Sequence, residues 1–455
     1  MARVIHSAIT QESGDSPSHN TPAPGRAHHG VHVFSALRHR NFRLFWFGQI
    51  ISVTGTWMQS IGQAWLVLQL TQNAFLLGLV SALQFLPVLF FSVFGGVIAD
   101  KLPKRRILVF TQSAAMFQAF VLFVLAGTNV VQVWHVMVLA FCLGLVNSFD
   151  IPTRQAFISE MVGREDLMNA VSLNSAQFNA SRVVGPGVAG LLIALLGIPP
   201  LFLLNAVSYI AVIAGLAMMD PALLHAAQRR ATLESPLRQV REGMAFAWRT
   251  PSIRLALLML FVISTFGMNF NIVLPLLAED VYHTGAPGFG LLSSMLGAGS
   301  LVSALVLAAT VKRPRAGLLV ASAIGFSVLE FAIAATPLSQ VALLLLALLG
   351  FASITFSATA NTTLQTNSPD HMRGRVMSLF AMVFAGATPI GALLTGTVAN
   401  LYGARAAMAV GALPCALIAA YAWLAIRPAR GARTPGAGRA GLDSSGVRPA
   451  VTAHH

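Results

Sequence analysis

Long apolar stretches alternate with short polar links along almost the whole chain, for example in 78–98 and 255–277. A helix that crosses a bilayer needs about 20 mostly apolar residues. About twelve stretches approach that length, so the pattern predicts an all-α membrane protein with twelve transmembrane helices. The predicted spans are 44–69, 76–99, 107–127, 132–152, 168–196, 199–218, 253–279, 287–310, 316–335, 338–362, 375–398 and 403–426.

The polar link after the sixth predicted helix, residues 220–251, is long and rich in arginine. It divides the chain into an N-terminal six-helix bundle, 41–219, and a C-terminal six-helix bundle, 252–427. The polar ends, 1–40 and 428–455, are expected to be disordered tails. Because the first tail has no apolar core before a cleavage site, the first membrane helix is expected to act as an uncleaved targeting signal.

Basic residues are distributed unevenly between the two sides that the predicted helices define. The links after even-numbered helices carry most of them, and those after odd-numbered helices carry almost none apart from Arg405. Cytoplasmic loops of membrane proteins are enriched in Lys and Arg. The distribution therefore predicts that both termini are cytoplasmic and that the chain crosses a bacterial inner membrane many times.

The composition agrees with this assignment and excludes other classes. Hydrophobic residues make up 56% of the chain and charged residues only 10%, which argues against a cytosolic enzyme, a secreted domain or a disordered scaffold. The net charge of +14 lies in the links and tails, so it indicates membrane topology and interaction with lipids rather than nucleic-acid binding. Cys142 and Cys415 lie in apolar stretches, and no catalytic, nucleotide or metal-ligand motif is present. No enzyme activity, cofactor or metal is expected.

The two halves also resemble each other in sequence. A basic link follows both the second and the eighth predicted helix, at 100–106 and 311–315, and Pro186 and Pro389 occupy corresponding helices about half a chain apart. Such repeats place a substrate site near the membrane midplane, between the halves.

The segment 96–106, Gly-Val-Ile-Ala-Asp-Lys-Leu-Pro-Lys-Arg-Arg, is the most specific motif. A positive-inside anchor explains its basic run but not its glycine and aspartate at fixed spacing. The segment resembles the cytoplasmic loop signature of the major facilitator superfamily, Gly-x-x-x-Asp-(Arg/Lys)-x-x-(Arg/Lys)-(Arg/Lys), which implies a role in conformational gating. The motif residues are Gly96, Asp100, Lys101, Lys104, Arg105 and Arg106. Gly96 is expected to permit close helix approach, Asp100 to accept hydrogen bonds and the basic run to face lipid headgroups.

The fifth predicted helix contains Gly185, Pro186 and Gly190. This grouping predicts a pliable segment with a face for close packing, although glycine and proline are common in membrane helices. It resembles the Gly-Pro-x-x-Gly signature of exporters in the superfamily, except that Leu191 replaces a closing glycine.

Two further segments, 149–174 and the Met-Arg-Gly-Arg of 372–375, resemble the bacterial transmembrane secretion effector branch, which includes the enterobactin exporter. Gating roles are accordingly expected for Arg373 and Arg375. The resemblance covers essentially residues 34–427. It implies efflux of siderophores, drugs or other amphiphiles.

Polar residues at helical spacing inside apolar helices are candidates for a substrate cavity. Arg182 is placed near mid-bilayer, where an unpartnered guanidinium costs at least ~2.5–3.5 kcal/mol, so it is expected to face a cavity or an interhelical partner. Thr56, Gln59 and Gln63 share a face of the first helix, and packing remains an equal alternative for them. The predicted cavity residues are Thr56, Gln59, Gln63, Asn179, Arg182, Asn269 and Asn271.

Few carboxylates lie in or beside the predicted helices. Asp150 and Arg154, four residues apart, are expected to form an ion pair with a structural or gating role. Glu330 stands alone in an apolar stretch and, like Asp150, is a possible proton site.

These features predict a monomeric secondary active transporter, not an enzyme, that exports a small amphiphilic molecule by alternating access in exchange for protons. An importer or lysophospholipid flippase of the same fold remains an alternative. A membrane receptor or scaffold is the non-transport alternative.

Overall fold

The computed structural model describes residues 34–225, 236–310 and 316–426. These residues are almost entirely helical; most of both predicted tails and part of the predicted linker lie outside them. The first half contains η1 (Ser35–Arg38), α1 (Arg40–Thr71), α2 (Ala74–Lys101), α3 (Lys104–Gly127), α4 (Val133–Val162), α5 (Leu167–Leu196) and α6 (Pro199–Ala217). The rest contains η2 (Pro221–Leu223), α7 (Pro236–Arg249), α8 (Pro251–Phe266), α9 (Phe270–Leu276), η3 (Leu277–Val281), α10 (Gly285–Thr310), α11 (Ala316–Ala335), α12 (Ser339–Thr366) and α13 (Asp370–Ile426).

Ten segments of the described chain are long and apolar enough to cross a membrane. The last of them is interrupted at Gly403, whose φ of 84° is a left-handed conformation that glycine adopts without strain. α13 therefore consists of two helices in succession. α1 is 32 residues long but more polar and is not among the ten. The count of twelve spans remains a prediction.

Two predicted helix boundaries were wrong. The fourth helix does not end at residue 152, because Pro152 lies inside α4 and the helix continues to Val162. Phe157, Ile158 and Met161 recur at helical spacing after the proline and are buried, so packing sustains the helix through a segment that looked like a polar link. The predicted span 253–279 is divided into α8, α9 and the π-helical η3.

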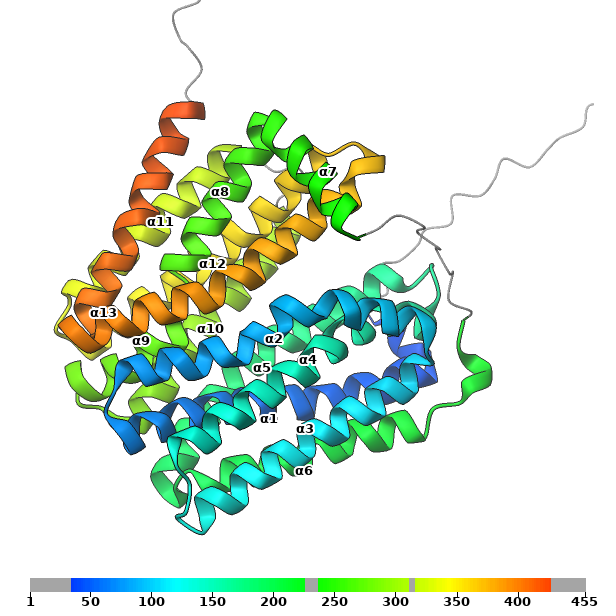
Figure 1. Cartoon of the computed structure of the whole chain (residues 1–455), viewed down its shortest axis with the longest axis horizontal. Helices are drawn as coiled ribbons and strands as arrows, with labels where there is room; N and C mark the ends of the chain where they lie inside the picture. Colours follow the sequence, from blue (N-terminus) through cyan, green and yellow to red (C-terminus); the bar gives the residue numbers. More distant parts are fainter. Residues whose placement is uncertain (1–33, 226–235, 311–315, 427–455) are drawn as a thin grey trace, which may run out of the picture.

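The helices form two bundles, α1–α6 and α8–α13, that meet at an angle (Figure 1). The bundles touch where α5 packs on α10 and α2 packs on α13. They diverge toward the side on which α7 lies, which we call the linker side (Figure 1). The opposite side, where the turns after α1, α3 and α5 lie, is called the far side.

Glycines allow the two bundles to approach closely near the far side. A Cβ added to Gly190 of α5 would lie 2.9 Å from both the Ala286 oxygen and the Gly290 Cα of α10. Next to this contact, the Ser294 hydroxyl of α10 donates to the Val183 oxygen of α5 at 2.8 Å. Direct backbone contact without side chains in between closes this end of the molecule.

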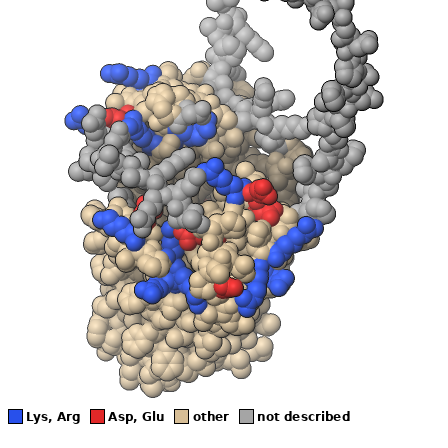
Figure 2. Space-filling view, turned by 90° about the vertical axis from the view of Figure 1, so that its right-hand side faces the viewer, with Lys and Arg blue, Asp and Glu red and all other residues tan. Residues whose placement is uncertain are grey.

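The linker contains a helix that the sequence analysis did not predict. α7 packs on the beginning of α13, and its Glu242 forms an ion pair with Arg375 at 2.7 Å. Figure 2 shows the linker side, where Lys and Arg side chains gather around the helix ends.

We predict that Gly190→Leu opens the far-side contact, because a larger side chain in a packed helix interface costs about 1–3 kcal/mol. Ser294→Cys, in a Cys142→Ala background, would report this opening as faster labelling by a thiol reagent added on the far side. Gly325→Leu is the matched control, since a Cβ at Gly325 meets nothing within 4 Å. Equal labelling rates in all three proteins would contradict the prediction.

Candidate functional site

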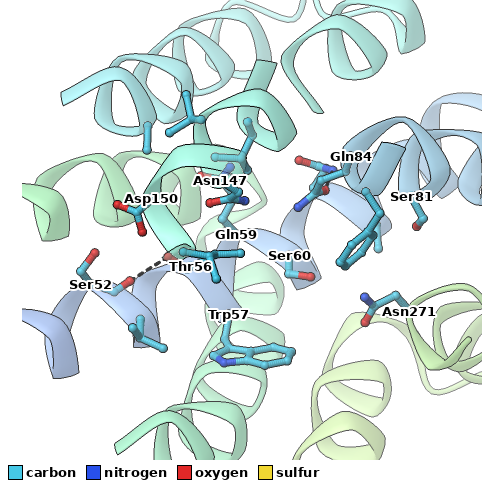
Figure 3. Close-up of a pocket in the computed structure, with 18 of the residues that line it drawn as sticks. Ser52, Thr56, Trp57, Gln59, Ser60, Ser81, Gln84, Asn147, Asp150 and Asn271 are labelled. Atoms are coloured by element: carbon cyan, nitrogen blue, oxygen red, sulfur yellow. Dashed lines mark hydrogen bonds between the residues drawn. The ribbon is translucent and has the colours of Figure 1, made fainter. Parts of the chain in front are cut away.

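A cavity of about 300 Å³ lies mainly inside the first bundle and is bounded by α1, α2, α3 and α4. Phe178 of α5, Tyr209 of α6 and Asn271 of α9 complete its lining. Figure 3 shows Asn271 reaching toward the cavity from the second bundle, across from Ser60 and Ser81. The cavity therefore lies where the two bundles face each other.

Helical periodicity places polar side chains on the cavity wall. On α1, the lining residues Gln49, Ser52, Thr56, Gln59 and Gln63 follow 3-4-3-4 spacing, which keeps them on one face.

Two other helices repeat the pattern. Ser81 and Gln84 line the cavity from α2, and Asn147, Asp150 and Arg154 line it from α4 at 3-4 spacing. Among the described lining residues, Asp150 and Arg154 are the only charged ones, so the wall carries no net charge when both are ionised.

The rest of the wall is apolar and aromatic. Trp57 and Phe178 pack edge to face with ring centroids 5.8 Å apart. Leu77, Val80 and Val67 lie toward the far-side ends of α2 and α1. The cavity thus combines hydrogen-bonding groups with a surface for an apolar body, as small-molecule sites commonly do.

Several of the predicted cavity amides are already engaged with each other. Gln59 donates to the Gln118 oxygen at 3.0 Å and accepts from the Asn205 amide at 2.7 Å, which ties α1 to α3 and α6. Gln63 donates to the Gln84 oxygen at 3.2 Å. Both predicted alternatives for these residues, cavity lining and interhelical packing, are therefore present together.

Asp150 has the most elaborate surroundings in the cavity. Its Oδ1 accepts hydrogen bonds from the Thr111 hydroxyl and the Gln112 amide, each at 2.8 Å. Its Oδ2 lies 3.2 Å from the Arg154 guanidinium, which also donates to the Gln49 oxygen at 3.1 Å. The ion pair that the spacing predicted is present, and it joins α4 to α1 and α3.

Other predicted cavity residues do not line this cavity. Asn179 donates to the backbone oxygen of Ser175 on its own helix at 2.9 Å. Asn269, which precedes α9, donates to the backbone oxygen of Thr265 on α8 at 2.7 Å. Arg182 lies over the Trp57 ring, with its guanidinium carbon 5.8 Å from the ring centroid. The Trp57 ring therefore separates Arg182 from the cavity. Among the described residues, no carboxylate forms an ion pair with Arg182.

Glu330, on α11, also lies away from the cavity. Its side chain is buried, and its Oε2 has no hydrogen-bond partner among the described residues. Of the two predicted proton sites, only Asp150 lines the cavity.

The loop motif differs in detail from expectation. A Cβ at Gly96 would meet nothing within 4 Å, so the predicted close approach at Gly96 was wrong. Gly95 makes that approach instead, against the Ser148 oxygen of α4, because it lies about 100° around the helix from Gly96. Asp100 is exposed and has no hydrogen bond or ion pair to another described residue.

The basic part of the motif also has partners within the protein. Lys104 is buried and pairs with Glu160 of α4 at 2.7 Å, so the expectation that it faces lipid headgroups was wrong. Arg105 donates to the Ala217 oxygen at the end of α6 at 2.7 Å. Lys101 and Arg106 remain exposed.

The helix-five motif and the arginines after α12 also make packing contacts. A Cβ at Gly185 would lie 2.6 Å from the Trp57 Cβ, so this glycine brings α5 against α1, while Gly190 brings α5 against α10. Pro186, which lies between these two glycines in the sequence, is also buried. Arg373 donates to the Gln365 oxygen at 3.3 Å, on the same side of the molecule as the Arg375 ion pair.

The N-terminal η1 is attached to the start of α5. Asp166 accepts from the Ser35 hydroxyl at 2.6 Å and lies 2.8 Å from the His39 ring nitrogen. The Ser35 hydrogen bond, followed by that of His39, lowers the pKa of Asp166 from its ordinary value. These contacts hold the linker-side ends of α1 and α5 together.

Comparison with known proteins identifies the chain. A family model described as "Transmembrane secretion effector" matches residues 31–433. The chain belongs to this family of major facilitator transporters.

Three curated relatives of the transporter illustrate the range of the family. The staphyloferrin A transporter of Staphylococcus aureus is 26% identical, over 79% of this chain and 90% of the relative. The multidrug efflux pump Tap of Mycolicibacterium fortuitum is 28% identical, over 83% and 94%. Macrolide efflux protein A of Streptococcus pyogenes is 23% identical, over 80% and 90%.

Solved structures confirm the fold of the transporter. The nucleoside transporter NupG has a TM-score of 0.67 at 12% identity, covering 87% of this chain and all of that one. A bacterial homologue of the human lysosomal transporter Spinster, inward-facing and unoccupied, has a TM-score of 0.68 at 12% identity, covering 85% of this chain and 97% of that one.

Several residues that line the cavity of the transporter were not predicted from the sequence. Gln49 lies three residues before Ser52 on the polar face of α1 that lines the cavity. Ser81 and Gln84 lie three residues apart on α2, and Asn147 lies three residues before Asp150 on α4. Their spacing was visible in the sequence. Gln112 carried no such signal, because it is the sole polar lining residue of α3.

We predict that Asp150 and Arg154 are energetically coupled. In a double-mutant cycle with Asp150→Asn and Arg154→Gln, thermal unfolding of the purified transporter should give an interaction energy of about 0.5–3 kcal/mol, as expected for contacting groups. Glu330→Gln with Arg154→Gln is the control pair and should be additive, because these residues lie in different bundles. Additive effects for Asp150 and Arg154 would contradict the coupling.

Proposed function

We propose that this transporter exports a small amphiphilic molecule across the bacterial inner membrane by alternating access, driven by exchange for protons. The two bundles act as the moving units, joined by the linker. The linker side is the cytoplasmic side, and both termini lie there. The observation that carries the proposal is a cavity with mixed polar and apolar walls in the first bundle, which reaches Asn271 of the second bundle. The two bundles are in close contact at only one end.

The arrangement of the bundles fits an inward-open state. Close contacts through Gly190 and Gly290 seal the far side, and the bundles diverge toward the linker side (Figure 1). A cavity in this position can receive a molecule from the cytoplasm. Release outside then requires the far-side contacts to separate while the linker-side ends approach.

We propose gating roles for the linker-side motifs on the same basis. Asp100 is exposed and unpaired among the described residues, so it is available to a partner from the second bundle once that bundle approaches. Arg373 and Arg375 lie at the end of that bundle. The ion pair of Asp150 with Arg154 lies deeper, in the cavity wall itself.

The cavity wall supports an amphiphilic substrate. Trp57, Phe178 and neighbouring aliphatic side chains offer an apolar surface, whereas amides and the Asp150 pair offer hydrogen bonds. Arg182, stacked on Trp57, is a second anchor for an oxygen-bearing group after a small movement of that ring. The relatives named for multidrug, macrolide and siderophore transport support the same class of molecule.

The proposed topology has twelve spans, with α1 and the two parts of α13 completing the ten apolar segments. We predict that reporter fusions after Gln72, Gly197 and Gly403 give an external signal, and that fusions after Gly163 and Asn367 give a cytoplasmic one. Correctly expressed fusions with any of these assignments inverted would refute the topology.

We predict that cells expressing the transporter accumulate less erythromycin, ethidium or staphyloferrin A than cells with an empty vector, for at least one of the three compounds. A protonophore should abolish the difference, because the proposed energy source is the proton gradient. The Gly190→Leu variant, which disturbs the far-side contact, is the matched control and should accumulate more than the wild type.

The same assay separates the alternatives. Higher accumulation in expressing cells would indicate import, and protonophore-independent uptake of a fluorescent lysophospholipid would indicate flipping. No difference for any compound would refute the export proposal and favour a receptor or scaffold.

A further inference from the structure

Asp150 combines burial with access to the cavity. Its side chain is almost wholly buried, with a relative exposure of 3%, yet it lines the cavity beside Ser52 and Thr56 (Figure 3). A carboxylate in this position is costly unless it is paired and hydrogen-bonded. Its neighbours therefore determine which charge state the site holds.

In the state described, Asp150 accepts two hydrogen bonds and forms one ion pair. Thr111 and Gln112 donate to Oδ1, and Arg154 lies against Oδ2. The surrounding helices contribute no second acid: α1 supplies Gln49 and Ser52, α3 supplies Thr111 and Gln112, and α6 supplies the Tyr209 hydroxyl.

One buried atom is not satisfied by this arrangement. The Gln112 side chain donates to Asp150, but its Oε1 is buried and has no partner among the described residues. An unpaired buried acceptor is destabilising, because it has lost its hydrogen bonds to water and gained none in the protein. The Asp150 carboxylate cannot relieve that cost, because it has no hydrogen to donate.

A protonated Asp150 has the missing donor. An acid and a primary amide can form a cyclic pair, in which the amide N–H donates to the acid carbonyl and the acid O–H donates to the amide oxygen. The Gln112 Nε2 contact already provides half of that pair. The second hydrogen bond, from the acid O–H to Gln112 Oε1, forms if Oδ2 is protonated and turns from Arg154 toward Gln112.

We infer that Asp150 carries the proton in the transport cycle, with Arg154 as the partner of its carboxylate and the Gln112 oxygen as the acceptor of its carboxylic acid. This inference rests on the proposed proton-coupled export. A proton from water in the cavity adds to Oδ2, the O–H bond forms, and the ion pair with Arg154 breaks. The reverse step returns the proton to water and restores the pair.

Arg154 links proton binding to the cavity. Its NH1 stays bound to the Gln49 oxygen, so the guanidinium remains at the wall when Asp150 becomes neutral. Its freed N–H groups can then donate to an oxygen of the substrate. When Asp150 loses its proton, the carboxylate competes for the same donors, which gives exchange of proton and substrate at one site.

Infrared difference spectroscopy of the full-length protein in lipid bilayers tests the inference without a substrate. Lowering the pH should produce a carbonyl band of a carboxylic acid that is shielded from bulk water, distinct from the bands of the exposed carboxyl groups, and Asp150→Asn should remove it. Glu330→Gln, which changes the other buried carboxyl group, should retain it. A band that survives Asp150→Asn, or that is lost in Glu330→Gln, would overturn the inference.

The position of the band tests the role of Gln112. Gln112→Leu removes a hydrogen bond to the acid carbonyl and should move the band to higher frequency. Gln177→Leu is the matched control, because Gln177 is also buried with an unpartnered Oε1 but does not line the cavity. An unchanged band in Gln112→Leu, or an equal shift in both variants, would exclude the acid–amide pair.

Transport separates this inference from the proposed function. Wild-type efflux that is abolished by a protonophore supports proton-coupled export whatever Asp150 does. Asp150→Asn should lose that protonophore-sensitive efflux while still exchanging substrate down its gradient. Coupled efflux that persists in Asp150→Asn would leave export intact and refute only the assignment of the proton to Asp150.

Discussion

Polar groups inside lipid must be satisfied within the protein, and this requirement governs the whole structure. Backbone groups meet it by forming helices, since a helix pairs its own N–H and C=O groups. Side chains meet it by pairing across helices, as Gln59 does with Gln118 and Asn205, and Gln63 with Gln84. The same pairs that hold α1 in the first bundle also form part of the cavity wall.

The two bundles contribute unequally to the site. Helices of the first bundle provide almost the whole lining, whereas the second contributes Asn271. Close packing of α5 on α10 and of α2 on α13 gives the second bundle a different task, because it closes the far side. In the proposed mechanism, substrate contacts therefore come mainly from the first bundle, whereas the second bundle takes part in gating.

The linker-side ends are connected by a set of ion pairs. Lys104 with Glu160 joins α3 to α4, and Glu242 with Arg375 joins α7 to α13. The first pair lies within the first bundle and the second attaches the linker helix to the second bundle, so neither pair joins the two bundles. They stiffen the ends of each bundle while leaving the bundles free to approach, which suits rigid units that move relative to each other.

The sequence by itself determined the helical class and nearly all positions of the long apolar helices, because lipid imposes a length and a polarity that are local properties of each segment. It also determined the family, through the motif at 96–106 and the segments 149–174 and 372–375. It also determined the pairing of Asp150 with Arg154, since residues four apart on one helix are neighbours. The end of α4 was predicted wrongly from the sequence, because buried Phe157 and Met161 extend the helix past Pro152.

Only the tertiary structure decided which polar residues meet. Gln112 reaches Asp150 from another helix, Glu242 reaches Arg375 from the linker, and Gly95 rather than Gly96 faces α4. Arg182 was predicted to line the cavity or pair with another helix, yet its guanidinium lies over the Trp57 ring beside the cavity. The rotation of each helix about its axis depends on all of its neighbours together, and no single segment of the sequence contains that information.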